Sequence, residues 1–199
     1  MASVADSSNP DRAAKAGRPR DGSVDDRVLA ATRELLMELG WDELSVRGVA
    51  FRAGVGRGTI DRRWTSKAEL VLHAILGATP DLAPFDGTDR DGWVRWVATG
   101  SREIFAKPEV RAAVPGLLGT FTRDEKLRQQ LWQTFSGPPV ELFSLDSSRE
   151  KSDSGLDARA LIAMAAGAAL FLSIIGVEDD TDDVHARIGE LLARSIDRS

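Results

Sequence analysis

The sequence contains no cysteine. Disulfide bridges and thiolate metal sites are therefore excluded, which agrees with a protein of the reducing cytoplasm. The two histidines, His73 and His185, are isolated in sequence, so we expect surface or packing residues rather than metal ligands. No HExxH, G-x-S-x-G or Walker pattern is present, so the sequence predicts neither an enzyme nor a bound cofactor.

No hydrophobic segment reaches the length of a membrane span. The first residues lack the apolar centre of a signal peptide. The longest apolar run, residues 160–175, has 16 residues and includes Ser173. A helix needs about 20 residues to cross a bilayer. We therefore expect a buried helix here and no membrane association.

The sequence also lacks internal repeats, and it lacks the alternation of apolar and polar residues that is typical of β-strands. Apolar residues recur instead at spacings of three and four, which predicts an all-α protein. Ser23, Ser45 and Ser66 stand where helix caps are expected, and Gly40 and Gly54 where helices should end. In the N-terminal part we expect helices over residues 23–40, 45–54, 57–64 and 66–77.

Residues 77–88 hold two prolines and two glycines and are interpreted as a linker. It separates a domain over residues 23–77 from a second helical domain over residues 88–199. In the second domain we expect a helix from Trp93 to Phe105, one starting at Pro108, and others over 121–135, 140–145, 160–175 and 181–196. Gly137-Pro138-Pro139 should break or kink the chain, and residues 146–155 should form a flexible loop.

Charge is distributed unevenly along the chain. The formal net charge is −5, yet residues 44–67 contain six Lys or Arg and one acid, Asp61. Residues 77–199 hold 14 basic and 20 acidic residues, so the second domain is not expected to bind nucleic acid. Residues 1–22 are expected to be a disordered basic arm, in which Arg18 and Arg20 form a tetrapeptide with Gly17 and Pro19. It either enters a minor groove, as similar AT-hook segments do, or is a solvated linker.

Ala50, Gly54 and Ile60 are spaced as in a helix-turn-helix over residues 45–64. The small Ala50 lets two helices touch, Gly54 permits the turn, and Ile60 fixes the second helix on the first. In such a unit the second helix presents its first residues to the major groove. The sequence places Arg57 and Thr59 there, while Trp64 is expected in the core.

Several motifs between Val24 and Ile75 carry a family resemblance. They are Leu39-Gly40-Trp41, Leu44-Ser45-Val46-Arg47, Ala50-x-x-Ala53-Gly54-Val55 and Gly58-Thr59-Ile60-x-Arg62-x-Trp64-x-Ser66-Lys67-x-x-Leu70. This segment, about a quarter of the chain, resembles the DNA-binding domain of TetR-type transcriptional regulators. The resemblance implies an all-helical homodimer that binds a palindromic DNA operator. It also implies a C-terminal domain that holds the dimer interface and a pocket for a small-molecule effector, whose binding releases the repressor.

The resemblance also suggests which residues contact DNA. Matching positions are Ser45, Arg47, Gly58, Thr59, Arg62 and Lys67, and the helical pattern turns Arg57 and Arg63 outward beside them. Arg52 is expected to be a solvated helix residue. The sequence departs from the family at Gly56, which replaces a polar cap, at Arg63-Trp64, and at Asp61, which replaces an aromatic residue. Asp61 either accepts from a cytosine amino group or pairs with Arg57 or Arg62.

The second domain is less informative. Its aromatic residues either line an apolar effector pocket or fill the core; they are Phe105, Phe121, Trp132, Phe135, Phe143 and Phe171. The last two helices are the expected dimer seam, with candidate contacts at Ala163, Ala166, Gly167, Ile188 and Leu192. Two other functions stay open: a helical enzyme whose basic patch binds an anionic substrate, and a dimerising adaptor that has lost DNA binding, which Asp61 would explain.

Overall fold

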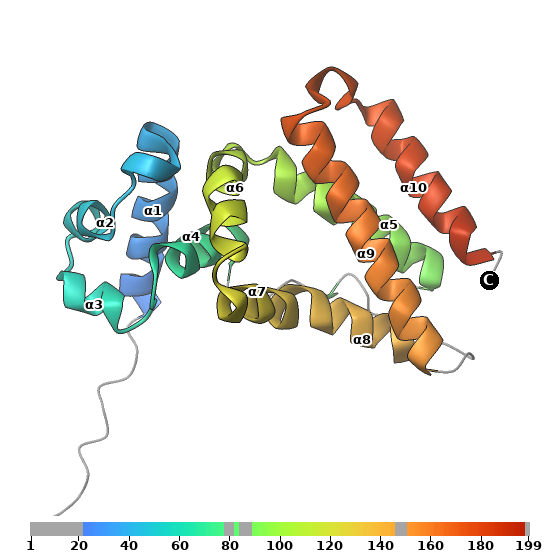
Figure 1. Ribbon diagram of the computed structural model, residues 1–199, viewed down its shortest axis with the longest axis horizontal. Coiled ribbons are helices and arrows are strands. Elements are labelled where there is room, and N and C mark those ends of the chain that lie inside the picture. Colours follow the sequence, from blue (N-terminus) through green and yellow to red (C-terminus); the bar gives the residue numbers. More distant parts are fainter. Residues whose placement is uncertain (1–21, 78–81, 84–88, 146–150, 198–199) are drawn as a thin grey trace, which may run out of the picture.

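The computed structural model describes residues 22–77, 82–83, 89–145 and 151–197 (Figure 1). All regular secondary structure in these ranges is helical, which confirms the all-α prediction. The predicted basic arm, with Arg18 and Arg20, lies outside the described residues, except that Gly22 begins the first helix.

The N-terminal head consists of α1 (Gly22–Glu43), α2 (Val46–Ala53), α3 (Arg57–Asp61) and α4 (Lys67–Leu76). Gly40 has a φ of 73°, a left-handed value that interrupts α1 where the sequence predicted its end. The apolar stripes of these helices meet in one core, which includes Val28, Leu36, Val49 and Ile60. The head is therefore folded around the helix-turn-helix.

The body contains the remaining helices, namely α5 (Arg90–Ala106), α6 (Pro108–Phe121), α7 (Glu125–Leu131), α8 (Gly137–Leu145), α9 (Lys151–Ile174) and α10 (Asp182–Asp197). Helices α5, α8, α9 and α10 share a core around Trp93 and Phe143, whose rings lie 4.5 Å apart. Helix α6 instead buries Val110, Ala113 and Leu117 in the core of the head. The head is thus packed directly onto one helix of the body, as Figure 1 shows.

Two predicted boundaries in the body were wrong, and one predicted break takes an unexpected form. Phe121 ends α6 rather than starting a helix, because the side chain of Asp124 accepts from Leu127 N at 2.9 Å and caps α7. The predicted break at Gly137-Pro138-Pro139 is a π-helical turn, Trp132–Ser136, that leads into α8. Both prolines closely follow this turn, and because they have no N–H they cannot continue the hydrogen-bond pattern of α7. Residues 151–155, expected to be loop, already belong to α9.

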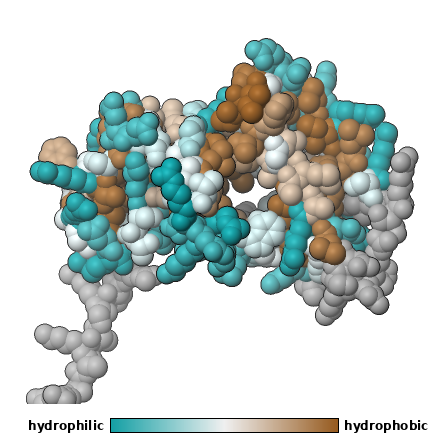
Figure 2. Space-filling model, in the orientation of Figure 1, coloured by the Kyte–Doolittle hydropathy of each residue, from teal (hydrophilic) through white to brown (hydrophobic). Residues whose placement is uncertain are grey.

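Helix α9 was expected to be buried on all sides, and it is not. Ala158, Leu161 and Ala165 are buried against the body, whereas Met164, Phe171 and other apolar residues on another side are exposed. By length and composition, residues 154–174 would suffice to cross a membrane. Figure 2 shows the hydrophobic surface over α9 and its connection to α10, while the rim of the head is mostly hydrophilic.

Candidate nucleic-acid interface

The capping residues of α2 fix the geometry of the helix-turn-helix. The hydroxyl of Ser45 accepts from Gly48 N at 3.1 Å, which confirms Ser45 as the N-cap. At the other end Gly54 has φ 66° and ψ 36°, a conformation that suits glycine. Val55 N then donates to Ala50 O at 3.0 Å and closes the turn into α3.

Helix α3 is short and presents two cations to solvent. It ends at Asp61 rather than Trp64, and Gly56 provides no side-chain cap. Arg57 and Arg62 are exposed, as is Gly58, while Thr59 is half-buried. Asp61 Oδ2 lies 3.4 Å from Arg57 Nε, so the predicted pairing of Asp61 with a neighbouring arginine is confirmed.

Arg63 does not face outward as predicted. Its guanidinium forms an ion pair with Asp25 in the first turn of α1, and it also donates to Thr59 O at 3.1 Å. The Arg63 side chain is only 18% exposed. The carboxylate of Asp25 holds it because a partly buried cation needs a partner. Arg63 therefore fastens the end of α3 to α1.

Lys67 lies at the junction of α1 and α2. Its Nζ donates to Trp41 O at 2.8 Å and to Leu44 O at 3.2 Å, and it stands 4.6 Å from the centre of the Trp41 ring. Burial lowers the pKa of Lys67, against the opposing effect of Asp42. An ammonium group has three donors, so the two bonds to carbonyl groups leave one donor of Lys67 over.

Two further residues of the head make structural contacts. Trp64 is buried, as predicted, and its Nε1 donates to Nδ1 of His73 at 2.6 Å. Arg52 is not merely solvated, since it forms a two-bond pair with Glu38, at 2.9 and 2.7 Å, and also reaches Glu34. This contact lowers the pKa of the Glu38 carboxyl and raises that of Arg52. Arg52 thereby fixes α2 against α1.

The structure separates the six aromatic residues considered for an effector pocket. Phe105 and Phe121 line an apolar cavity of about 130 Å³ between α4, α5, α6 and α9. Phe143 is buried against Trp93 in the other core, and Phe135 is half-buried in the π-helical turn. Trp132 and Phe171 are 41% and 54% exposed. Most of the cavity wall is aliphatic and was missed: Leu72, Ile75, Leu76, Ile104, Val110, Val114, Leu117, Leu118, Leu131 and Leu170.

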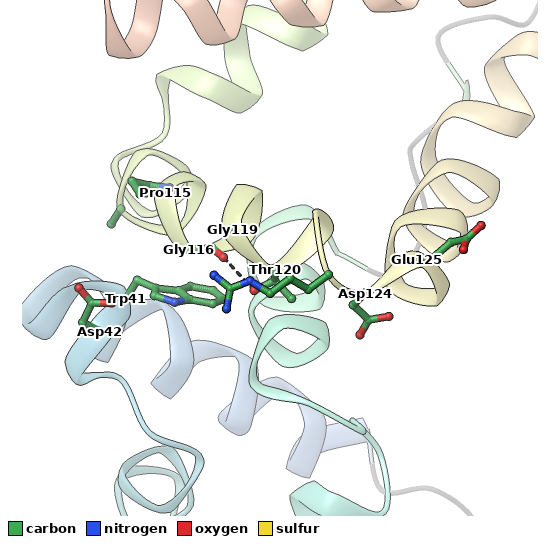
Figure 3. Close-up of a pocket in the computed structure, with 10 residues that line it drawn as sticks. Trp41, Asp42, Pro115, Gly116, Gly119, Thr120, Asp124 and Glu125 are labelled. Carbon is green, nitrogen blue, oxygen red and sulfur yellow. Dashed lines mark hydrogen bonds between the residues drawn. The ribbon is translucent and has the colours of Figure 1, made fainter.

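A second, wider depression of about 780 Å³ lies where the head meets the body (Figure 3). Trp41 and Asp42 of α1 line one side, and Gly116, Gly119 and Thr120 of α6 line the other. The Trp41 indole points toward Gly116. A Cβ at Gly116 would lie 2.0 Å from the ring, so only glycine fits there.

The candidate dimer residues differ in their exposure to solvent. Ala163 and Gly167 are exposed on α9, and Ala166 and Ile188 are half-buried. Leu192 is 6% exposed and packs inside its own chain, so it does not face a partner as predicted. His185 is a packing residue that bonds Asp180 at 2.6 Å. Across the described ranges, no group of three or more His, Asp or Glu could hold a metal ion.

A helix-turn-helix with exposed arginines on its second helix defines the class of DNA-binding regulators. Residues 28–74 match the family described as bacterial regulatory proteins of the tetR family. The chain is 31% identical over 196 residues to the uncharacterized HTH-type transcriptional regulator Rv1556 of Mycobacterium tuberculosis, covering 92% of this chain and 95% of that one. The chain therefore belongs to the TetR family of transcriptional regulators, and it is not an enzyme.

Other similarities agree with this family. The chain is 30% identical over 126 residues to the uncharacterized HTH-type transcriptional regulator YdeS of Bacillus subtilis, a match that covers 62% of this chain and 63% of YdeS. Among solved structures, the repressor NalD of Pseudomonas aeruginosa has a TM-score of 0.58 and 19% identity, with 87% of this chain and 97% of NalD covered. A TetR variant of Acinetobacter baumannii in complex with minocycline has a TM-score of 0.56 and 20% identity, with coverages of 91% and 98%. These two structures have the same fold.

Proposed function

We propose that the protein is a homodimeric repressor in the cytoplasm that binds a palindromic operator and releases it when a small apolar molecule enters the body. The observation that carries DNA binding is the pair of exposed guanidinium groups, Arg57 and Arg62, on a capped helix-turn-helix. Ser45, Arg47, Gly58, Thr59 and Lys67 surround them as further contacts. Arg63 contributes by positioning α3, and Arg18 and Arg20 extend the contact into the minor groove.

The exposed side of α9 supports a dimer. Met164, Phe171, Ile174 and Ile175 expose between 40% and 68% of their surface there, and Leu191 of α10 exposes 52%. The small residues Ala163 and Gly167 on this side allow a partner helix to approach closely. Paired with a second copy, α9 and α10 form a four-helix seam. A symmetric dimer places its α3 helices about 34 Å apart, or a multiple of that distance, to match the operator half-sites.

The apolar cavity supports an apolar effector, because its exposed lining has no polar surface. At about 130 Å³ it is smaller than the ~300–1,000 Å³ typical of drug-sized ligands. A larger effector therefore enters only by displacing a wall. The solved TetR variant of Acinetobacter baumannii is in complex with minocycline. For this chain, the lining of the cavity favours a small, apolar effector.

Helix α6 is the wall that links effector and DNA. Val114 and Leu117 of α6 face the cavity, while Gly116 of the same helix lies under Trp41 of the head. Displacing α6 therefore moves the ring, and with it the α1–α2 junction held by Lys67. A ligand that binds better to the displaced state shifts the population away from DNA binding.

The test is a fluorescence-anisotropy titration of the full-length protein with duplex DNA from upstream of its own gene. Saturable binding that unrelated duplex does not compete supports the proposal. Arg62→Ala should weaken binding and reduce the slope of log K against log salt by about one unit per lost phosphate contact. Equal, weak binding of all duplexes would instead favour an adaptor that has lost operator recognition.

A further inference from the structure

Phe51, in the middle of α2, is 90% exposed, more than any other large hydrophobic residue in the described ranges. Its neighbours Val49, Ala50 and Ala53 are buried in the head. A phenyl ring held in water forfeits the free energy that burial would supply. A lone exposed apolar residue is common, so its surroundings must show whether it has a partner.

The two flanks of α2 differ in what they contact. Arg52 marks one flank, which faces α1, because it pairs with Glu34 and Glu38. Phe51 follows Arg47 by four residues, so the two share one side of α2, one turn apart and about 6 Å along the axis, and they are turned by about 100° and about 140° from Arg52. Arg47 is exposed as well. This side therefore presents a guanidinium and a phenyl ring next to each other to solvent.

We propose that Phe51 contacts the DNA duplex beside the phosphate that Arg47 binds, a step that rests on the proposed function. In a helix-turn-helix the first helix of the unit crosses the sugar–phosphate backbone. The phenyl ring cannot bond a phosphate, so its contact is with the apolar parts of DNA at the groove edge. These are the carbons of deoxyribose and the 5-methyl group of thymine, which phenylalanine is known to contact.

This contact gives Phe51 a role distinct from that of the arginines. Arginine contacts with phosphate release counterions and weaken as salt rises. An apolar contact adds affinity that is nearly independent of salt. If the ring lies on a thymine methyl group, Phe51 also selects thymine at one position of each half-site.

The experiment uses the full-length protein and a duplex that it selects from a randomised library. Phe51→Ala should raise the Kd for this duplex by about five- to tenfold, because a partly buried phenyl contact is lost. The slope of log K against log salt should not change. Phe51→Leu should recover part of the loss. Because Phe51 makes so little contact within the chain, the thermal midpoint should not move. Met37→Ala, which truncates a 51% exposed side chain of the same head on α1, is the matched control and should bind like wild type.

A duplex with uracil in place of thymine identifies the contacted group. If the ring contacts the thymine methyl group, wild type should bind the uracil duplex more weakly than the thymine duplex, and Phe51→Ala should bind the uracil duplex as well as wild type does. If the ring contacts deoxyribose, Phe51→Ala should lose the same affinity, relative to wild type, on both duplexes. Binding by Phe51→Ala within about twofold of wild type at every salt concentration would overturn the inference. The inference would also be overturned if the protein self-associated without DNA and Phe51→Ala abolished this association, because the ring would then bind a second copy of the chain. Failure of wild type to select any duplex would refute the proposed function itself, before a variant is made.

Discussion

The indole ring of Trp41 lies directly on Gly116, so that the last turn of α1 and the middle of α6 touch without an intervening side chain. Lys67 lies over the same ring and bonds the carbonyl groups of Trp41 and Leu44. The contact thus joins the DNA-binding head to the helix that walls the apolar cavity.

Gly116→Ala tests this contact. Because the new methyl group would stand 2.0 Å from the ring, we expect a loss of about 1–3 kcal/mol in the free energy of unfolding and weaker operator binding. Gly119→Ala is the matched control, since nothing lies within 4 Å of its Cβ. Trp41→Ala in the Gly116→Ala background should restore part of both losses. Thermal and anisotropy curves that coincide for the two alanine variants would refute the role of the contact.

Asp61→Asn should strengthen DNA binding. The change releases Arg57 from its 3.4 Å ion pair and removes a negative charge from the recognition helix. We expect a lower Kd and a salt slope steeper by about one unit, measured by anisotropy across a potassium chloride series. Weaker binding restricted to duplexes with cytosine at one position would show instead that Asp61 reads a base.

Arg63→Ala should lower stability rather than the salt slope. Its ion pair with Asp25 is partly buried, so the loss should be about 1–3 kcal/mol, between the values for exposed and buried pairs. Urea unfolding measures this loss, and Asp25→Asn should reproduce it. A reduced salt slope at unchanged stability would place Arg63 on a phosphate.

Glu69 should make the head acid-sensitive. Partial burial is the largest single effect and acts to raise its pKa, but the two bonds from Thr65, each 2.6 Å long, together with His73 and Gln130 hold the pKa below the usual 4.5. Glu69 therefore stabilises the fold above pH 4.5, and this contribution is lost as the pH falls through the lower folded pKa. The stability of Glu69→Gln should fall less steeply with decreasing pH below 4.5 than that of wild type. Parallel curves would contradict this.

Phe171→Glu should produce a monomer. The side chain is 54% exposed on α9, so the chain itself tolerates the charge, whereas a symmetric seam would bury two of them. Sedimentation velocity should show the change, and Met37→Glu, which replaces a similarly exposed residue of the head (51%), should stay dimeric. A dimeric Phe171→Glu variant would place the seam elsewhere.

Local signals in the sequence predicted the head well. Ser45, Gly54 and Ser66 act through bonds to residues a few positions away, so their roles as caps could be read directly. The partner of Arg63 could not be predicted from the sequence, because Asp25 is distant in sequence and only the packing of α1 brings it near.

The body was less predictable for a different reason. Helix α9 is apolar on nearly every side, so the spacing of its apolar residues does not predict that Phe171 faces outward. On α10, the spacing of the apolar residues did not show that Leu192 faces the core of its own chain. The cavity was sought among aromatic residues, whereas its wall is mainly leucine, isoleucine and valine. Such a wall has no composition that distinguishes it from ordinary core.

The intramolecular pairs of the head have a consequence for how tightly it holds DNA in the cell. Of the six basic residues in 44–67, Arg52, Arg57 and Arg63 are matched by carboxylates and Lys67 by carbonyl groups. Within the described ranges only Arg47 and Arg62 among the six lack such a partner. Arg47 and Arg62 alone correspond to about four displaced cations for a dimer and a salt exponent of about −3.6, and each paired cation that exchanges its internal partner for a phosphate makes the exponent steeper. The sensitivity of the regulator to intracellular potassium therefore depends on how many of these pairs open on DNA.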